Sequence, residues 1–396
     1  MIHVYKADYN LCMGLKWRNA VFQAEEVDVL NQGQYGGRSR CSASDPVLIE
    51  ELQLDISRVT RKTVVQTNRD ATACYDRIIP NLAMVASQKF GVPATVTQAC
   101  ATTLEKAEYK IRTDLGLAQT GYHHSPESPV FVTGQGSSFS PAIWFFISCI
   151  LYNIYEKMAK TAAYCTPDRS HVFEIGMIGF VDDNNDQTNR FLQDEDSTTL
   201  PLVLAQTQHN AQCWNDLLTA SGGALEIPKC SYHVVHWKFE KNGSPVLVEL
   251  DNSLPTVFFV KDSPTSQPQY LQLLSPYTAH KTLGHFKEPA GTQKEQFRQL
   301  KQRIEDTVSF LWNVPLSRSE AWTFYTGYYL PSVTYPLTCS HFTSNQLESV
   351  QKKALCILLA QCGYNRNMKR AVVFGPQEYG GGQAFSVCTI IKALAR

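Results

Sequence analysis

Hydrophobic residues that recur every three or four positions predict several helices along the chain. The predicted helices cover 15–30, 45–59, 94–115 and 200–219, and a helical pattern returns from Gln293 to the end. Asp45–Pro46 and Ser140–Pro141 each combine a capping side chain with a following proline, which is typical of a helix start. The most hydrophobic run, Ala142–Leu151, has about half the length of a membrane span, which indicates a core helix and no membrane segment.

Shorter segments rich in β-branched and aromatic residues predict strands between these helices. They are Thr63–Val65, part of Glu174–Asp183, Tyr232–Trp237, Val246–Leu250 and Thr256–Val260. The segment Glu174–Asp183, EIGMIGFVDD, is almost continuously hydrophobic before its last two residues. Such a run is typical of a strand buried on both faces.

That strand ends in two adjacent acids, Asp182 and Asp183, at a point where the chain must turn. The polar residues Asn184, Asn185 and Asp186 predict that the turn continues. A core strand rarely ends in two like charges unless a positive group binds there, because desolvating a pair of carboxylates is costly. A divalent cation would supply that charge, and a polar hairpin turn is the alternative interpretation.

A second acidic segment, DATACYD, follows the strand predicted at Thr63. Asp70 at the mouth of a strand can ligate a metal ion, and Tyr75, five residues later, can pack beneath a bound sugar. A helix start capped by Asp70 or Thr72 is the alternative.

Two glycine-rich segments offer further candidates. In NQGQYGGRSR, at 31–40, Arg38 can bind a phosphate through two parallel hydrogen bonds, although a plain surface loop has the same composition. In TGQGSSFSP, Gly134 and Gly136 flank Gln135 and leave the backbone open to a flat ligand. A linker before a core helix explains the Ser-Pro of this segment but not its Gly-Gln-Gly.

The chain has 396 residues, enough for two or three domains, and its formal net charge is +0. A nucleic-acid surface must therefore come from local clustering, for which Lys294, Arg298 and Lys301 share one predicted helix face. A solvated helix face is at least as good an explanation. The 12 cysteines show no CxxC pair and no zinc-ligand spacing. With no signal peptide, this indicates reduced thiols in the nucleus or cytoplasm.

Taken in order along the chain, these segments resemble the reverse transcriptase (RNA-directed DNA polymerase) domain of a retrotransposon of the non-LTR kind. QYGGRSR resembles a fingers motif, DATACYDRI the first catalytic motif, TGQGSSFSP the QG–SP motif and FVDD the paired-aspartate hairpin. IPKC resembles a lysine-bearing palm motif and TLGH the primer-grip turn. The motifs extend over roughly Gln34–His285.

The resemblance implies an α+β fold with the architecture of a right hand. It assigns fingers, with their N-terminal part truncated, to 1–62 and the first part of the palm to 63–93. A fingers or palm insertion follows at 94–130. The rest of the palm, with an antiparallel sheet and the primer-grip turn, spans 131–288, and a helical thumb or connection spans 289–396.

The resemblance also implies two-metal nucleotidyl transfer from a dNTP to a primer 3′-hydroxyl on an RNA template, with a DNA or RNA primer. Two Mg²⁺ ions, for which Mn²⁺ is a possible substitute, would be held by Asp70 and Asp182, with Asp183 auxiliary. The resemblance further implies that Lys229 is the general acid, that Arg38 binds the triphosphate, and that the backbone near Ala71 completes the metal coordination. It also implies that Gln135 and Gly136 line the nucleotide pocket and that Leu283 and Gly284 contact the primer.

Tyr75 bears on the choice of nucleotide, because an aromatic ring beneath the sugar collides with a 2′-hydroxyl. The resemblance therefore implies DNA synthesis and disfavours an RNA-dependent RNA polymerase. Gly37 stands where the family has an aromatic residue. The alternative function is a catalytically inactive RNA-binding scaffold derived from such a domain, and the sequence indicates no oligomeric state.

Overall fold

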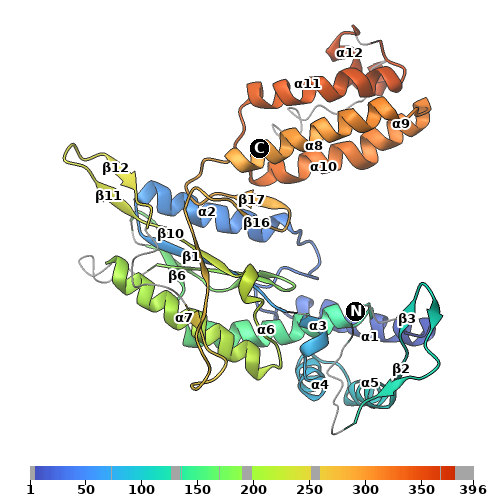
Figure 1. Ribbon diagram of the computed structural model, residues 1–396, viewed down its shortest axis with the longest axis vertical. Coiled ribbons are helices and arrows are strands. Elements are labelled where there is room, and N and C mark those ends of the chain that lie inside the picture. The colour runs from blue at the N-terminus through green and yellow to red at the C-terminus, as the bar shows by residue number, and fades with distance from the viewer. Residues whose placement is uncertain are drawn as a thin grey trace. The chain divides into compact units, whose positions relative to one another are not determined.

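Helices and short strands together build the chain, which confirms the predicted α+β class (Figure 1). The computed structural model describes residues 5–72, 74–125, 134, 136–168, 170–189, 199–250, 259–365 and 367–379. The chain divides into two units: unit 1 comprises Met1–Pro46 and Ile56–Pro276, and unit 2 comprises Val47–Asp55 and Tyr277–Arg396.

A five-stranded sheet with the strand order β15-β10-β1-β9-β8 forms the centre of unit 1. Its strands are β1 (Val64–Asp70), β8 (Ile178–Phe180), β9 (Asp183–Thr188), β10 (Ser231–Val235) and β15 (Gln272–Leu274). β1 is antiparallel to both β9 and β10, whereas β15 is parallel to β10. β1 therefore lies in the middle of the sheet, with its last residue, Asp70, at the sheet's end.

Helices α6 (Ser140–Met158) and α7 (Leu200–Ala220) lie along one face of this sheet (Figure 1). Eleven side chains of α6 are buried, including Trp144, Phe146 and Tyr152, which confirms that the hydrophobic run at 142–151 belongs to a core helix. The prediction of a helix at 200–219 is also confirmed. Each helix in the described part of the chain is too short or too polar to span a lipid bilayer.

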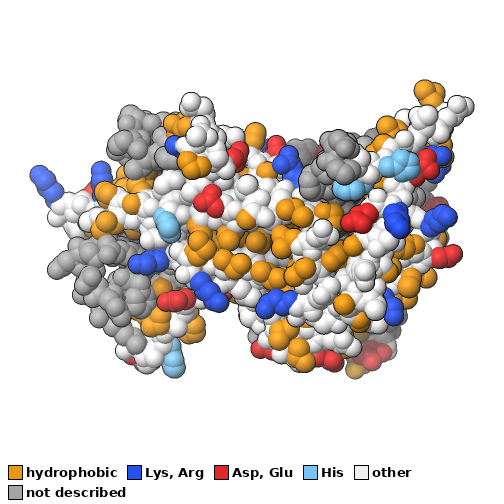
Figure 2. Space-filling model, turned by 90° about the horizontal axis from the view of Figure 1, so that it is seen from below, with side chains coloured by type: hydrophobic (Ala, Val, Ile, Leu, Met, Phe, Trp, Pro, Cys, Tyr) orange, Lys and Arg blue, Asp and Glu red, His pale blue; other side chains and the backbone are white. Residues whose placement is uncertain are grey.

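The main core of unit 1 joins α6 to four more helices: α1 (Ala7–Glu26), α3 (Cys74–Arg77), α4 (Pro80–Lys89) and α5 (Ala94–Lys106). Some large apolar side chains of these helices stay exposed, among them Val85 of α4 and Met158 of α6. Figure 2, viewed from below Figure 1, shows hydrophobic side chains lying between charged ones. All cysteines of the described segments are free thiols, as predicted.

Strand β1 is polar along most of its length and nevertheless buried, since Gln66, Thr67, Asn68 and Arg69 are each at most 3% exposed. Burial of such groups is tolerated only where they are paired. Arg69 forms an ion pair of 2.8 Å with Asp186 of β9, which lies opposite Thr67 in the antiparallel ladder and therefore diagonal to Arg69. The predicted strand at 63–65 therefore continues through polar residues to Asp70.

Residues 184–186 were predicted to form a turn, and that prediction is wrong. They belong to β9, where Asn184, Asn185 and Asp186 are at most 5% exposed. Tyr152 of α6 donates a hydrogen bond to Asn184, and Tyr155 donates one of 2.6 Å to Asp186. These partners on α6 stabilise polar residues in a strand that their local preference would not predict.

Several element boundaries also differ from the prediction. The first helix is Ala7–Glu26, not 15–30. The helix predicted at 94–115 ends at Lys106, and four short strands follow: β2 (Glu108–Tyr109), β3 (Arg112–Thr113), β4 (Gly116–Leu117) and β5 (Tyr122–His123). β3 and β4 form a hairpin, β2 pairs with β5 on either side of it in the sequence, and the Tyr109 and Tyr122 rings stack at 5.3 Å. This cross-strand pairing outweighs the helical spacing of the segment.

The remaining strands of unit 1 form small two-stranded sheets. They are β6 (Ala162–Cys165) with β7 (Val172–Ile175), β11 (Trp237–Phe239) with β12 (Pro245–Leu247), and β13 (Phe259–Val260) with β14 (Gln269–Tyr270). Strands were predicted near β10 to β13, and the structure confirms strands there with different bounds; residues 256–258 of the last predicted strand lie outside the described residues.

Unit 2 is mainly helical and has its own hydrophobic core. Its helices are α8 (Lys294–Asn313), α9 (Arg318–Phe324), α10 (Leu330–Thr334), α11 (Ser344–Gln361) and α12 (Arg370–Phe374). The helical pattern predicted from Gln293 is confirmed for the described residues, whereas 389–396 lie outside them. The basic residues predicted on one face of α8 are exposed, and one of them, Arg298, pairs with Glu295 at 2.6 Å.

Two predicted helix starts need correction. Helix α2 (Ser44–Thr60) confirms the helix predicted at 45–59, but its N-cap is Ala43 and Asp45 lies in its first turn. Helix α6 begins at Ser140 with Phe139 as N-cap. The Ser137 hydroxyl accepts the backbone N–H of Ser140 at 3.1 Å, so it takes the capping role that was assigned to Ser140.

Candidate active site

The sheet of unit 1 brings three predicted acids to one end. Asp70, the last residue of β1, is the Cα partner of Asp183, the first residue of β9. Directly opposed residues on antiparallel strands have Cα atoms about 5 Å apart. Asp182 lies in the turn just before β9, and its carbonyl oxygen accepts the backbone N–H of Ala71 at 3.3 Å. Residues more than a hundred positions apart in sequence are thus fixed as neighbours by backbone hydrogen bonds.

The electrostatics of this cluster disfavour its own negative charge. Burial raises the pKa of Asp183 to about 6, with further contributions from Asp182 and Asp70. Burial also raises the pKa of Asp182, and the charge of Asp70 adds to that effect. Carboxyl groups respond in this way when they are desolvated next to like charges. A bound cation would relieve both causes of these raised pKa values.

One cation of the protein already lies in the cluster. Lys229, at the end of the 3-10 turn Ile227–Lys229, places its Nζ 2.7 Å from Oδ2 of Asp70. This hydrogen bond raises the pKa of Lys229, whose side chain is 67% exposed. The ammonium group is therefore held at the surface of the cluster by a single carboxylate and is free of packing constraints.

Glu226 is a neighbour that the sequence did not single out. Its Oε2 accepts the hydroxyl proton of Thr72 at 2.8 Å, and its backbone N–H donates to the carbonyl of Asp70 at 2.9 Å. Ala71 forms an isolated antiparallel bridge with Leu225. The segment that carries Lys229 is thus hydrogen-bonded to the residues around Asp70. Spacing along the chain gives no signal for this contact.

The donor atoms of the cluster bear on whether it can hold Mg²⁺ or Mn²⁺. Among the described residues, no three His, Cys, Asp or Glu side chains converge on a point that could hold a metal ion. The donors are nevertheless carboxylate oxygens, the ligands that both ions prefer, and the strand register brings them together. The Asp70 carboxylate is directed to Lys229. The residues therefore fit the ions in type and in backbone placement, with Lys229 as the cation now paired with Asp70.

Tyr75 lies on the short helix α3 and packs, half-buried, against the main core of unit 1. Burial raises the pKa of its phenol, and the charge of Asp182 contributes to the shift. The structure thus brings Tyr75 within electrostatic range of the cluster. Gln135 lies outside the described residues. Its neighbour Gly136 has a φ of +112°, a conformation that favours glycine.

Arg38 does not extend freely from the glycine-rich loop. Its Nε lies 3.2 Å from Oε1 of Glu25 on α1, and one terminal nitrogen donates to Gln32 at 3.0 Å. Only 12% of the side chain is exposed. In this arrangement Arg38 stabilises the loop, so binding a triphosphate requires it to exchange Glu25 for the new anion.

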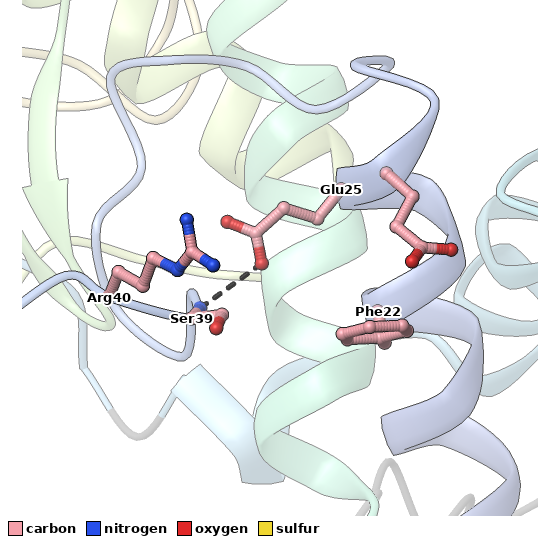
Figure 3. A pocket seen from close by; sticks show the side chains of 5 residues that line it. Phe22, Glu25, Ser39 and Arg40 are labelled. Atoms are coloured by element: carbon pink, nitrogen blue, oxygen red, sulfur yellow. Dashed lines mark hydrogen bonds between the residues drawn. The ribbon is translucent and has the colours of Figure 1, made fainter.

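A cavity of about 260 Å³ lies next to this ion pair (Figure 3). The same Glu25 carboxylate that binds Arg38 accepts the backbone N–H of Ser39 at 3.1 Å, drawn as the dashed line in Figure 3. The guanidinium of Arg40 points toward this carboxylate. The cavity lining consists of Phe22, Glu25, Glu26, Ser39 and Arg40.

The glycine-rich loop also packs against the strand that leads to the acids. Gly179 of β8 donates its N–H to the carbonyl of Gly33 at 2.8 Å and accepts the N–H of Tyr35 at 2.9 Å. A Cβ on Gly36 would lie 2.5 Å from the backbone nitrogen of Val181, so only glycine permits this close approach. The loop and the acidic turn therefore form one packed element.

Leu283 and Gly284 belong to unit 2, where they form the turn between β16 (His280–Thr282) and β17 (His285–Lys287). Their φ values are +49° and +83°, as a two-residue type I′ turn requires. Tyr335 donates a hydrogen bond of 2.6 Å to the carbonyl of Leu283. The predicted primer-contact turn is thus a rigid hairpin held by a helical residue of its own unit.

No protein-family model and no curated protein sequence matches this chain. Among solved structures, the chain is similar to telomerase from Candida albicans in complex with a fragment of telomeric RNA, with 13% identity, a TM-score of 0.37, and coverage of 97% of this chain and 58% of that one. For telomerase from Candida tropicalis in complex with a fragment of telomeric RNA, the identity is 13% and the TM-score 0.37, and the match covers 96% of this chain and 54% of that one. For apo telomerase from Candida tropicalis, the identity is 12% and the TM-score 0.38, and the match covers 89% of this chain and 51% of that one. The chain therefore spans between about half and three-fifths of these proteins.

Proposed function

We propose that this chain is an RNA-directed DNA polymerase of the retroelement kind. The observation that supports this most strongly is the register of β1 and β9, which pairs Asp70 with Asp183 and puts Asp182 in the adjoining turn. The raised pKa values of Asp182 and Asp183 add support, since an acid cluster of this kind is unfavourable without a cation.

In this proposal the palm comprises 63–93 and 131–288 and contains the sheet of unit 1. The segment 94–130 is an insertion, 1–62 belong to the fingers, and the helices at 289–396 form the thumb. The acids hold the ions, and the packed loop at 31–40 forms the wall of the site. When bound, two Mg²⁺ or Mn²⁺ ions would lower the pKa of the primer 3′-hydroxyl and stabilise charge on the phosphates.

The remaining residues position the substrates. Tyr75 excludes a 2′-hydroxyl and so favours dNTPs, and Arg38 binds the triphosphate after leaving Glu25. Lys229 leaves Asp70 when a nucleotide binds and donates its proton to the departing pyrophosphate. Gln135 and Gly136 line the base and sugar, and the turn at Leu283–Gly284 contacts the primer.

A catalytically inactive RNA-binding scaffold is the second candidate. Two observations favour it: Lys229 is paired with Asp70, and Arg38 is paired with Glu25, so both cations assigned to catalysis are engaged within the protein. Such a scaffold would bind RNA with an affinity that falls steeply with salt, and it would extend no primer.

Primer extension distinguishes the two candidates. The wild-type chain is mixed with an RNA template, a DNA primer, dNTPs and Mg²⁺, and is compared with Asp182→Asn and with Asp216→Asn as the control. Asp216 is an exposed acid on α7. We expect extension by the wild type and the control and at least about a hundredfold loss in Asp182→Asn. RNA binding without any extension by the wild type would select the scaffold, and extension by Asp182→Asn would contradict the metal assignment.

A further inference from the structure

The turn that carries Asp182 contains a backbone conformation that its own sequence disfavours. Phe180 of β8 pairs with Asp183 of β9, so Val181 and Asp182 form a two-residue hairpin turn. Val181 has a φ of +60°, as in the first central position of a type II′ turn, where glycine is usual. A β-branched residue is strained in this left-handed region. The surrounding structure must therefore hold Val181 in place.

Two buried side chains bind the two polar backbone groups of Val181. Its N–H donates to Oε1 of Gln34 at 3.3 Å, and its carbonyl accepts the indole N–H of Trp144 on α6 at 2.5 Å. Gln34 is 0% exposed and Trp144 is 1% exposed. Both hydrogen bonds thus join the half-buried Val181 to a side chain that is shielded from water, and such bonds are stronger than they would be at the surface.

Gln34 is itself fixed by groups from other elements. Its Nε2 donates to the Ser148 hydroxyl at 3.0 Å and to the Tyr152 hydroxyl at 3.4 Å, both on α6. Its Oε1 also accepts the N–H of Gly36 at 2.9 Å. One amide side chain thus connects the glycine-rich loop, the core helix and the acidic turn.

We infer that Gln34 and Trp144 are positioning residues that hold Val181 in the left-handed conformation and thereby fix the direction of the Asp182 carboxylate. The peptide of Asp182 follows that of Val181, and its carbonyl accepts both the N–H of Ala71 at 3.3 Å and the Asn184 side chain at 2.6 Å. A change at Val181 therefore moves Asp182 relative to β1. The inference rests on the proposed function in that Asp182 binds a cation, whereas the clamp on Val181 is a property of the fold.

The experiment uses Trp144→Phe, which removes the indole N–H and keeps an aromatic ring. Trp17→Phe is a matched control, because Trp17 is also fully buried in the same core and its indole donates to Ser87 at 3.1 Å. Val181→Gly, alone and combined with Trp144→Phe, provides a turn that adopts the left-handed conformation without strain. The readouts are the hydrogen-exchange rate of the Ala71 amide and the dissociation constant for Mn²⁺ measured by electron paramagnetic resonance.

Trp144→Phe is expected to speed exchange at Ala71 and to weaken Mn²⁺ binding, each by about tenfold. Trp17→Phe is expected to leave both within about twofold, and Val181→Gly to restore most of the loss caused by Trp144→Phe. Equal effects of the two tryptophan variants, or no rescue by Val181→Gly, would overturn the inference. If the wild type binds no Mn²⁺, the proposed function fails instead, and exchange at Ala71 alone decides whether the clamp exists.

Discussion

Replacing Asp183 by asparagine is expected to stabilise unit 1 at neutral pH when no divalent cation is present. The pKa of Asp183 is raised from 3.8 to about 6, first by burial and then by Asp182 and Asp70. A rise of about two units corresponds to roughly 3 kcal/mol at 1.36 kcal/mol per unit, and solvent screening of this partly exposed group reduces it to about 1–2 kcal/mol. Asparagine has a similar shape and carries no charge, so it avoids this cost.

The raised pKa of Asp183 also fixes the direction in which the free energy of unfolding changes with pH. A carboxyl group whose pKa is higher in the folded state keeps its proton longer there, so the folded state loses stability as the pH rises from about 4 to about 6. Above that window the loss is complete and constant. The difference in unfolding free energy between Asp183→Asn and the wild type should therefore grow between these pH values and then stay level.

Urea unfolding in the presence of a chelator measures this difference. Fluorescence of the buried tryptophans Trp17, Trp144 and Trp214 reports on unit 1. Asp216→Asn is the control and should change the unfolding free energy little at any pH. A variant at Asp183 that is no more stable than the wild type at pH 7, or a difference that does not depend on pH, would refute the view that the acid cluster is electrostatically strained.

Three further predictions concern other residues. Tyr75→Val should admit ribonucleotides in single-nucleotide incorporation assays, and an unchanged sugar preference would remove the steric role. Lys229→Met should bind Mn²⁺ several-fold more tightly, as measured by electron paramagnetic resonance, because Asp70 then loses its ion pair with Lys229. The control Lys241→Met, at an exposed lysine, should bind Mn²⁺ as the wild type does; equal affinities of the two variants would contradict a competition between Lys229 and the ion for Asp70. Gly284→Ala should lower the free energy of unfolding in guanidinium by about 1–2 kcal/mol, because the φ of Gly284 is +83°. Gly327→Ala is the control and should change it little, since a Cβ there would meet open space; equal losses in the two variants would count against strain in the turn.

Local patterns in the sequence predicted the elements that local forces determine. The helices at 45–59 and 200–219, the core helix at 142–151 and, among the described residues, the helical region after Gln293 are confirmed. The first two and the last carry an apolar face of helical period, whereas the run at 142–151 is apolar on nearly all sides and is buried accordingly. The meeting of Asp70 with Asp183 depends on strand register. Hydrophobic pattern alone does not fix a register for strands as polar as β1 and β9. The expectation that these acids lie together therefore came from the resemblance to a known family and not from periodicity.

The failures have physical causes of the same kind. Asn184–Asp186 have turn composition, yet Tyr152 and Tyr155 bind them from α6 and hold them in a strand. The sequence assigned no positioning role to Gln34, because its partners Val181, Ser148 and Tyr152 are more than a hundred residues away. The ion pair of Arg38 with Glu25 of α1 was not predictable from spacing either, because the fold brings the two side chains together. Contacts between distant polar residues leave no periodic signal in a single sequence.

The most direct test of the central claim is the location of Mn²⁺ by anomalous diffraction in crystals of the chain with an RNA template, a primer and a non-hydrolysable dNTP. The account predicts two anomalous peaks about 4 Å apart, bound by Asp70 and Asp182 on one side and by the triphosphate on the other. It also predicts that Lys229 has left Asp70. A complex in which the nucleotide is bound, no Mn²⁺ lies within ligand distance of Asp70 or Asp182, and Lys229 still pairs with Asp70 would contradict it.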